Sequence, residues 1–384
     1  MQIYFAIQSR HGSFPIKVLI IAISLMFVQP IAAQIDATDS DSDVHIIAAP
    51  YFLANSDDGL TIGFGFGAAY APRLYTISSF EYSLSGQMNM YAEGEVKLGE
   101  YRYVGRISFN RSERSIYPSL PVDPEPLVNA DVERIDIKMA ALRSYGSVFE
   151  FGPAIWVETA KGMRPEDADK NPLDLNMYPR FRPGTIALGG TRARWRTTSS
   201  VRPMNGYIFD VTTLGGAAWS DEWDAARPDL SVQFKGALAQ PVKDWMRLYL
   251  RAEIGLQLNT PPPLRYYNGG SKKVRGQPKR RETGRRAIYT RAQTHFTVVR
   301  DWTWPTEVAH SVLSFIPVYG LEVELVPFYD MGVIADPDFG WLPARHGFGM
   351  GLHLVLPPEL VVRIDVGMSP GGSPRFYFTI GEAI

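Results

Sequence analysis

The chain of 384 residues contains no cysteine, so disulfide bonds and thiolate metal sites are excluded. It also has almost no net charge, because 39 Lys and Arg are set against 40 Asp and Glu, for a formal charge of −1. A polyanion is usually recognised by a strong basic field, which this composition does not supply. The composition therefore gives no reason to expect nucleic acid as a partner.

Long apolar runs are also missing beyond the N-terminus, where no window has the 18 or more consecutive apolar residues of a membrane-spanning helix. This does not exclude a membrane protein, because the strands of a barrel alternate apolar and polar residues. The composition alone therefore leaves open both a soluble protein and a membrane barrel.

The N-terminus carries the one sustained apolar run, at 18–28, with Arg10 and Lys17 before it and the small residues Ala32 and Ala33 after it. This order predicts a secretory signal peptide over 1–33, cleaved near Ala33. The alternative is an N-terminal membrane anchor, for which the run is short. Residues 34–45 are polar and acidic, and we expect a flexible lead-in there.

From residue 46 onward the dominant pattern is alternation with a period of two. In 246–259 every even position is apolar and every odd position is polar, aromatic or glycine, whereas a helix would need apolar spacings of three and four. The pattern predicts strands at 46–54, 60–71, 75–86, 87–99, 101–113, 132–143, 147–160, 184–197, 206–217, 229–242, 246–259, 286–300, 321–335, 347–356, 360–369 and 375–384. The predicted fold is all-β, a 16-stranded antiparallel transmembrane β-barrel of the bacterial outer membrane covering 46–384.

The connections between these strands support the barrel independently. The long ones are 114–131, 161–183, 218–228, 260–285 and 336–346, and all follow odd-numbered strands, while most others are tight. Outer-membrane barrels place long loops on the extracellular rim and short turns on the periplasmic rim. A soluble sandwich, the alternative fold, has no reason to do so. Segment 301–320 is the exception, either an amphipathic insertion or a strand read wrongly.

If the apolar face meets lipid, the polar face lines the lumen, and it carries charges of both signs. We expect pairs that brace the wall, with an ion-selective pore as the alternative. Loop 260–285 is rich in cations, most of which we expect in solvent near lipopolysaccharide phosphates. Arg275 differs because glycines and a proline surround it, which favours a fixed backbone and an inserted side chain.

Five segments resemble the bacterial surface-antigen superfamily, which includes BamA-type and TamA-type assembly barrels and two-partner secretion transporters. Val274-Arg275-Gly276 resembles its Val-Arg-Gly-aromatic loop motif, and 327–332 resembles its Phe-x-Asp-x-Gly strand motif. Segment 196–206 resembles the turn before strand nine, and 347–351 with 375–384 resembles the final strands. The resemblance covers roughly 46–384 and is densest after 185.

The resemblance implies that loop 260–285 folds inward and that Arg275 meets Asp330 in the lumen, with Val274, Gly276 and Gly332 beside them. Alternation agrees with this placement, because Asp330 shares parity with Glu322 and Glu324, the expected lumen charges. The resemblance also implies an export-signal strand at the C-terminus, with Phe376, Phe378 and Ile384.

Two substitutions depart from the family pattern. Gln277 stands where the loop motif has an aromatic residue, and Ile384 stands where the terminal phenylalanine is usual. In addition, so few residues separate the cleavage site from the first strand that we expect no periplasmic POTRA domain.

The resemblance predicts insertion or translocation of proteins or lipids at the outer membrane. The alternatives are a passive pore or a structural surface antigen, or the barrel half of a system whose soluble partner is a separate chain. Expected partners are outer-membrane lipid, lipopolysaccharide and a periplasmic or surface protein.

We expect no enzymatic activity, no metal and no cofactor. The Gly-x-Ser-x-Gly match at 367–371 lies between two strands and has Pro370 after the serine, where an oxyanion hole needs a backbone N–H. The histidines lack metal-binding spacing in the sequence, and we expect His295 and His353 to be lumen residues.

Overall fold

The computed structural model describes residues 44–380 except 56–58, 71–73, 84–85, 117–127, 168, 175–177, 179–180, 199–203, 279–281, 313–317, 319, 337–339 and 357–359. The predicted signal peptide, most of the predicted lead-in and Ile384 lie outside these residues. Among the residues described, no helix combines the length and the apolar composition needed to cross a bilayer.

The described chain forms one antiparallel sheet of 17 strands, of which β16 (Gly340–Trp341) is a two-residue extension of a loop. The other sixteen are the sixteen predicted, with bounds that mostly differ by a few residues. They are β1 (Val44–Asn55), β2 (Gly59–Tyr70), β3 (Leu74–Ser83), β4 (Met88–Leu98), β5 (Tyr101–Ile116), β6 (Val128–Tyr145), β7 (Phe149–Asp167), β8 (Gly184–Arg196), β9 (Gly206–Ser220), β10 (Arg227–Lys243), β11 (Met246–Gln257), β14 (Arg286–Trp302), β15 (Leu321–Asp336), β17 (Arg345–Leu356), β18 (Leu360–Met368) and β19 (Arg375–Ile380).

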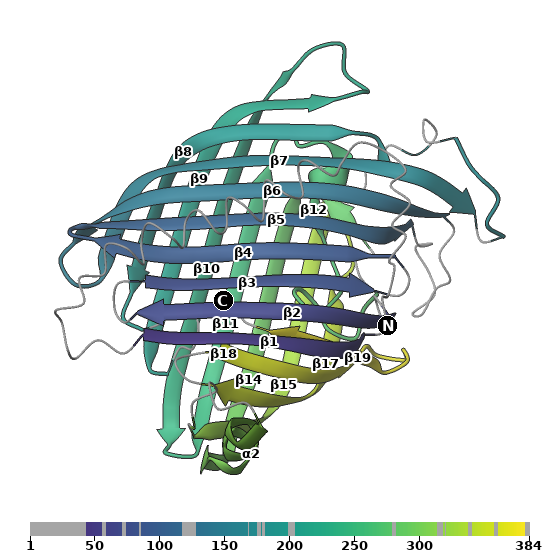
Figure 1. Cartoon of the computed structure of the whole chain (residues 1–384). Helices are drawn as coiled ribbons and strands as arrows, with labels where there is room; N and C mark the ends of the chain where they lie inside the picture. The colour runs from purple at the N-terminus through teal and green to yellow at the C-terminus, as the bar shows by residue number, and fades with distance from the viewer. Residues whose placement is uncertain are drawn as a thin grey trace, which may run out of the picture. The chain divides into compact units, whose positions relative to one another are not determined.

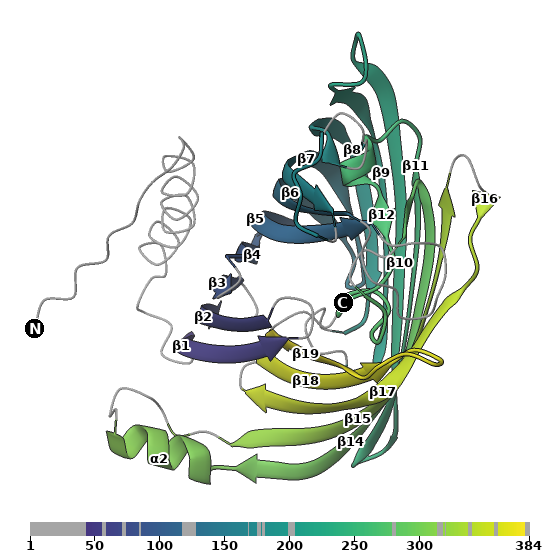
Figure 2. The same cartoon turned by 90° about the vertical axis from the view of Figure 1, so that its right-hand side faces the viewer.

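Each of these strands pairs in antiparallel register with the next one along the chain, from β1–β2 through to β18–β19. Figure 2 shows the strands arranged around an interior, with β1 beside β19. In the described residues no backbone ladder joins β1 to β19, so this junction differs from all the others. The predicted barrel architecture is confirmed, and β1 and β19 form its seam.

Alternation sends apolar side chains outward and polar ones inward, as β11 illustrates. Leu250 is 52% exposed and Ile254 48% exposed, whereas Tyr249 is 4% exposed and Glu253 6% exposed. Exposed apolar residues form such an outer face around the wall, on strands from β2 to β19. The outer face is therefore apolar, and the inward charges need partners because an unpaired buried charge is costly.

The two rims differ in their connections. The segment between β11 and β14 is the most elaborate, with the 3₁₀ turn η3 (Pro262–Leu264) and the short hairpin β12 (Tyr266–Tyr267) and β13 (Thr283–Gly284). On the opposite rim, most described turns are tight, such as 99–100 and 244–245.

The segment 301–320, which the sequence left ambiguous, contains the helix α2 (Trp304–Val312), located at the ends of β14 and β15 (Figures 1 and 2). It carries exposed Trp304, stacked on Trp302.

Candidate functional site: the loop clamp in the lumen

The connection between β11 and β14, residues 258–285, folds into the lumen. Its first part crosses to the other wall, where Leu264 packs in a buried cluster with Trp156 of β7 and Ile186 of β8. The contact is close, because a Cβ on Gly184 would lie 2.5 Å from Pro261. Prolines fix this stretch of backbone, and burial of Leu264 holds it against the wall. The loop is thus attached at one end before it reaches the site.

Arg275 lies at the centre of the site and is fully buried. Its Nε and Nη2 donate to the two carboxylate oxygens of Asp330 on β15, at 2.7 and 2.9 Å. Its backbone N–H donates to the same carboxylate at 3.1 Å, and Nη1 donates to Asp365 on β18 at 2.9 Å. A forked guanidinium–carboxylate contact is strong and directional, so these bonds fix the loop to two strands at once. We call Arg275, Asp330 and Asp365 the clamp.

Further groups complete the surroundings of the Arg275 guanidinium. The guanidinium carbon Cζ of Arg275 lies 3.3 Å from the centre of the Phe328 ring. Arg291 of β14 donates from Nε to Asp330 at 2.9 Å, so this acid is shared by two arginines. With its amide oriented to accept, Gln293 presents its oxygen 3.1 Å from Nη2 of Arg275. Burial would lower the pKa of Arg275, but Asp330 and Asp365 outweigh it and raise that pKa, so the guanidinium stays charged.

Glycines let the loop backbone lie directly on the wall. Gly276 has φ +89°, and a Cβ there would lie 2.4 Å from the Met368 backbone. A Cβ on Gly347 of β17 would lie 1.7 Å from the Arg275 carbonyl oxygen, and one on Gly367 of β18 would lie 2.9 Å from the Gly276 nitrogen. The glycine of the loop and those of the two strands therefore lie at the same contact, and we call them matched glycines. A side chain at any of these positions would push the loop away from the wall.

The structure brings together five residues singled out from the sequence, namely Val274, Arg275, Gly276, Asp330 and Gly332. Val274 is fully buried and fills the space that a Cβ on Gly332 would need. The main-chain oxygen of Gly332 also accepts from Asn268 at 3.2 Å.

The other predicted site residues lie elsewhere. Glu324 is buried in the lumen with Arg247 at 3.1 Å, and Glu322 is part-buried on the same face of β15. Phe376 of the last strand is exposed on the outside of the barrel, and Phe378 is half-buried.

Two cations expected in solvent face the lumen instead. Lys273 binds both oxygens of Glu253 at 2.9 Å and lies over the Tyr289 ring. Lys272 approaches the Tyr91 ring at 5.8 Å and lines the lumen cavity, whose volume is about 360 Å³. We expect most of the loop cations near lipopolysaccharide; these two lie instead on the part of the loop that the clamp holds in the lumen, although Lys272 is exposed there.

Sequence reasoning missed two contacts of the loop. Tyr377 of β19 is buried and its hydroxyl accepts from the Gly276 backbone N–H at 2.8 Å. Asp365 is the second acid of the clamp. Both have the inward parity of their strands, which is visible in the sequence. No signal in the sequence indicates how deep in the lumen the loop lies, and this depth decides which inward side chains it contacts.

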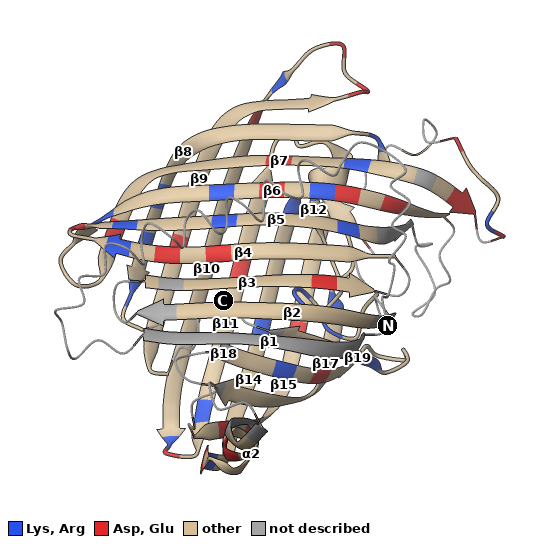
Figure 3. Ribbon diagram, in the orientation of Figure 1, with Lys and Arg blue, Asp and Glu red and all other residues tan. Residues whose placement is uncertain are grey.

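A second group of charges braces the opposite wall, and we call it the brace. Its centre is Glu95 of β4, which pairs with Arg194 of β8 at 2.8 Å and with Arg102 of β5 at 3.2 Å. Arg102 also pairs with Glu150 of β7 at 2.7 Å. Figure 3 shows acidic and basic residues interspersed along β4, β5 and β6. The charges of the brace are thus arranged in pairs, as a bracing role requires.

No family model matches this sequence, and no curated protein matches it significantly. Solved structures do match. BamA from Haemophilus ducreyi, in a form lacking POTRA domains 1–3, superposes with a TM-score of 0.50 at 10% identity over 89% of this chain and 70% of that one. CdiB from Escherichia coli superposes with a TM-score of 0.55 at 11% identity, over 88% of this chain and 62% of that one.

CdiB from Acinetobacter baumannii gives a TM-score of 0.51 at 12% identity, over 89% of this chain and 65% of that one. This chain thus spans less than two thirds of either CdiB. The match covers nearly all of this chain, including the described barrel. The chain has the fold of a BamA-like β-barrel.

Proposed function

We propose that this protein is an outer-membrane barrel that inserts or translocates proteins or lipids by opening the seam between β1 and β19. The observation that carries the proposal is the seam itself. Every other pair of neighbouring wall strands is joined by a backbone ladder, while in the described residues β1 and β19 lie side by side without one. Unpaired strand edges are templates for added strands, so an incoming strand could pair there.

The clamp supports the same proposal, because it holds a loop inside the lumen, where a passive pore would need its path. Loop 258–285 fills the interior next to β14, β15, β17 and β18, held by buried charges and by matched glycines. A passive pore needs a continuous wet path, whereas this loop occupies the lumen with backbone. The clamp also attaches the loop to β18, the strand next to β19, so the loop is joined to the wall beside the seam.

The proposed setting follows from the faces of the barrel. The N-terminal signal peptide would direct export, and the exposed apolar face would be covered by outer-membrane lipid. Arg286 is exposed at the end of β14 next to the long loop, where it would meet lipopolysaccharide phosphates. A periplasmic or surface protein would deliver or receive the cargo.

The absence of cysteine allows a direct test of the seam. Cysteines are introduced at position 46, 48 or 50 of β1, each combined with Phe376→Cys or Phe378→Cys in β19, and the pair that oxidises to a disulfide is kept. The purified barrel is placed in lipid vesicles, and the folding rate of a second, denatured outer-membrane barrel is followed by its heat-modifiable migration.

We expect the reduced protein to accelerate this folding and the oxidised protein to lose the acceleration. A matched control places the disulfide between Val211 and Phe234, which pair in register between β9 and β10. This control should leave the acceleration intact. If the reduced barrel gives no acceleration, or if seam and control disulfides act alike, the proposal fails.

A further inference from the structure

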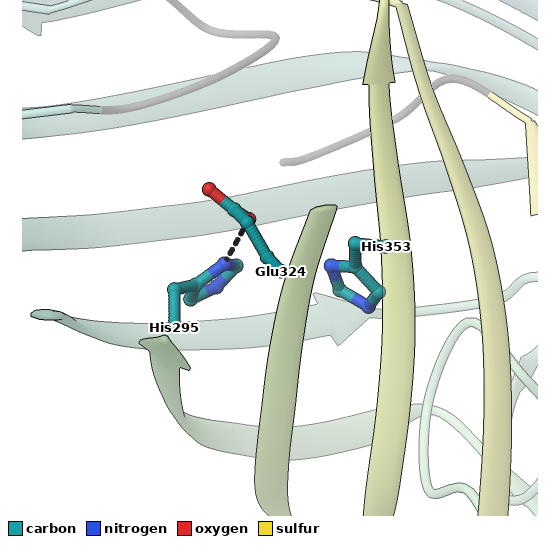
Figure 4. A group of neighbouring side chains, drawn as sticks. All are labelled: His295, Glu324 and His353. Carbon is teal, nitrogen blue, oxygen red and sulfur yellow. Dashed lines mark hydrogen bonds and ion pairs between the residues drawn. The ribbon is translucent and has the colours of Figure 1, made fainter. Parts of the chain in front are cut away.

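Two histidines and a glutamate converge in the lumen from three neighbouring strands. His295 lies on β14, Glu324 on β15 and His353 on β17, and one ligand atom from each lies within 4.8 Å of the other two. The sheet register produces this grouping. Glu324 of β15 is directly opposite His353 of β17. On the other side, Glu324 is opposite Thr297 of β14, and His295 lies two residues from Thr297 on the same face of that strand. Figure 4 shows the three side chains pointing toward one another. The grouping is invisible in the sequence because the three residues are far apart along the chain.

The set has the chemistry of a transition-metal site. Two imidazoles and one carboxylate suit Zn²⁺, Fe²⁺ or Ni²⁺, and they leave coordination positions open for water or another ligand. The side chains of Glu324 and His353 are each only 2% exposed, and that of His295 is 12% exposed. Strands hold all three, so the ligands are supported by rigid elements rather than by loops.

Outer contacts already orient two of the three groups. Nε2 of His353 lies 3.2 Å from Oδ1 of Asp365, which leaves Nδ1 to face Glu324. Oε1 of Glu324 accepts from Arg247 at 3.1 Å, while Oε2 lies 2.8 Å from Nδ1 of His295. A carboxylate behind a ligating histidine, and a hydrogen bond to a ligating carboxylate, are the usual supports of metal ligands.

We propose that His295, Glu324 and His353 form a divalent transition-metal site inside the barrel. The ion would take the place of the direct contact between His295 and Glu324, and it would join β14, β15 and β17. Asp365 connects this site to the clamp, because its other oxygen accepts from Arg275 at 2.9 Å. Metal binding would thus stiffen the part of the wall that holds the loop. The proposal does not depend on the function proposed above.

Substitution of Arg247 tests the proposed metal site most sharply, because the positive charge of Arg247 disfavours a cation there. Its Nη2 lies 3.1 Å from Glu324 and 3.3 Å from His295, so its positive charge repels an arriving metal ion. Removing that charge while keeping a hydrogen-bond donor for Glu324, as Arg247→Gln does, should tighten metal binding. If the three groups only brace the wall by hydrogen bonds, removing Arg247 would have no such effect.

The experiment uses the full barrel folded in detergent without a histidine tag, stripped with chelator and titrated with Co²⁺ and with Zn²⁺. We expect one ion per barrel, with a visible Co²⁺ absorption band that Zn²⁺ displaces. Glu324→Gln and His353→Ala should each weaken binding by about tenfold or more, and Arg247→Gln should strengthen it. His346→Ala is the matched control, since His346 contacts Tyr329 away from the site and should bind normally.

Heat-modifiable migration identifies the variants that fold, and only those are compared. Absence of saturable Co²⁺ and Zn²⁺ binding to the folded wild-type barrel would overturn the proposal. Equal binding by the wild type, Glu324→Gln and His353→Ala would overturn it as well, because the ion would then lie elsewhere.

Discussion

Arg275 and Asp330 are joined by three hydrogen bonds, although 55 positions separate them in the chain and neither is exposed to solvent. One residue belongs to a loop and the other to the wall, so the contact fixes the loop inside the barrel. Because both charges are buried, the pair is costly to break from one side only. This relationship underlies the first two predictions.

Replacing Arg275 by alanine should release the loop and destabilise the barrel. Asp330 and Asp365 would be left buried beside each other with less positive charge, at a cost of about 3–5 kcal/mol. The measurement is chemical unfolding of the folded barrel in detergent, with heat-modifiable migration as a second readout. Arg275→Lys keeps the charge but loses the planar guanidinium fork. Its unfolding free energy should therefore lie between those of the wild type and Arg275→Ala. Unchanged unfolding of Arg275→Ala would mean that the clamp does not hold the loop.

Replacing Gly276 by alanine should displace the loop by a steric route. The left-handed conformation at φ +89° costs an alanine about 1–2 kcal/mol, and its Cβ would also meet the Met368 backbone. Gly340→Ala is the matched control, because Gly340 has φ +70° but nothing within 4 Å of a Cβ. Protease cleavage within 258–285 should rise for Gly276→Ala only. Equal behaviour of the two variants would show that the close contact with the wall is unimportant.

Glu95→Gln should weaken the brace. The arginines at 102, 194 and 196 all pair with Glu95, so the change leaves three guanidinium groups with less compensation. We expect a loss of about 3–5 kcal/mol in unfolding free energy. Glu100→Gln is the control, because Glu100 forms an exposed pair with Arg143 on the rim and should have no measurable effect. A brace variant as stable as the control would refute the bracing role.

Leu250→Arg should impair membrane insertion, because Leu250 lies in the middle of β11 and points outward. An arginine on the lipid face near the bilayer midplane costs about 2–4 kcal/mol. The yield of folded barrel in lipid vesicles should therefore drop. Ala226→Arg, in an exposed loop, should fold as the wild type does. Normal folding of Leu250→Arg would argue that this face does not meet lipid.

Alternation predicts much of the fold from sequence. It places all sixteen wall strands, and it separates Tyr249 and Glu253 from Leu250 and Ile254 without any knowledge of the structure. This works because side-chain direction in a strand has a strict period of two and the outer face of the wall is apolar while the inner face is polar. Strand ends are less determined, as β7 shows by continuing to Asp167, seven residues past the predicted end at 160.

The site is only partly predictable because it depends on contacts between distant strands. The resemblance to surface-antigen barrels points to Arg275 and Asp330, but Tyr377 and Asp365 meet the loop only because β18 and β19 pass beneath it. The convergence of His295, Glu324 and His353 depends on the register of three strands. No spacing along the chain encodes that register.

The conductance of the purified barrel in planar lipid bilayers tests the central claim most directly. The seam-disulfide protein is recorded before and after reduction. If the lumen is closed by the clamp and the seam opens, the oxidised barrel should stay almost closed, and reduction should restore brief, large openings. A large, steady conductance that is the same in the oxidised and reduced states would instead identify a passive pore and contradict the account.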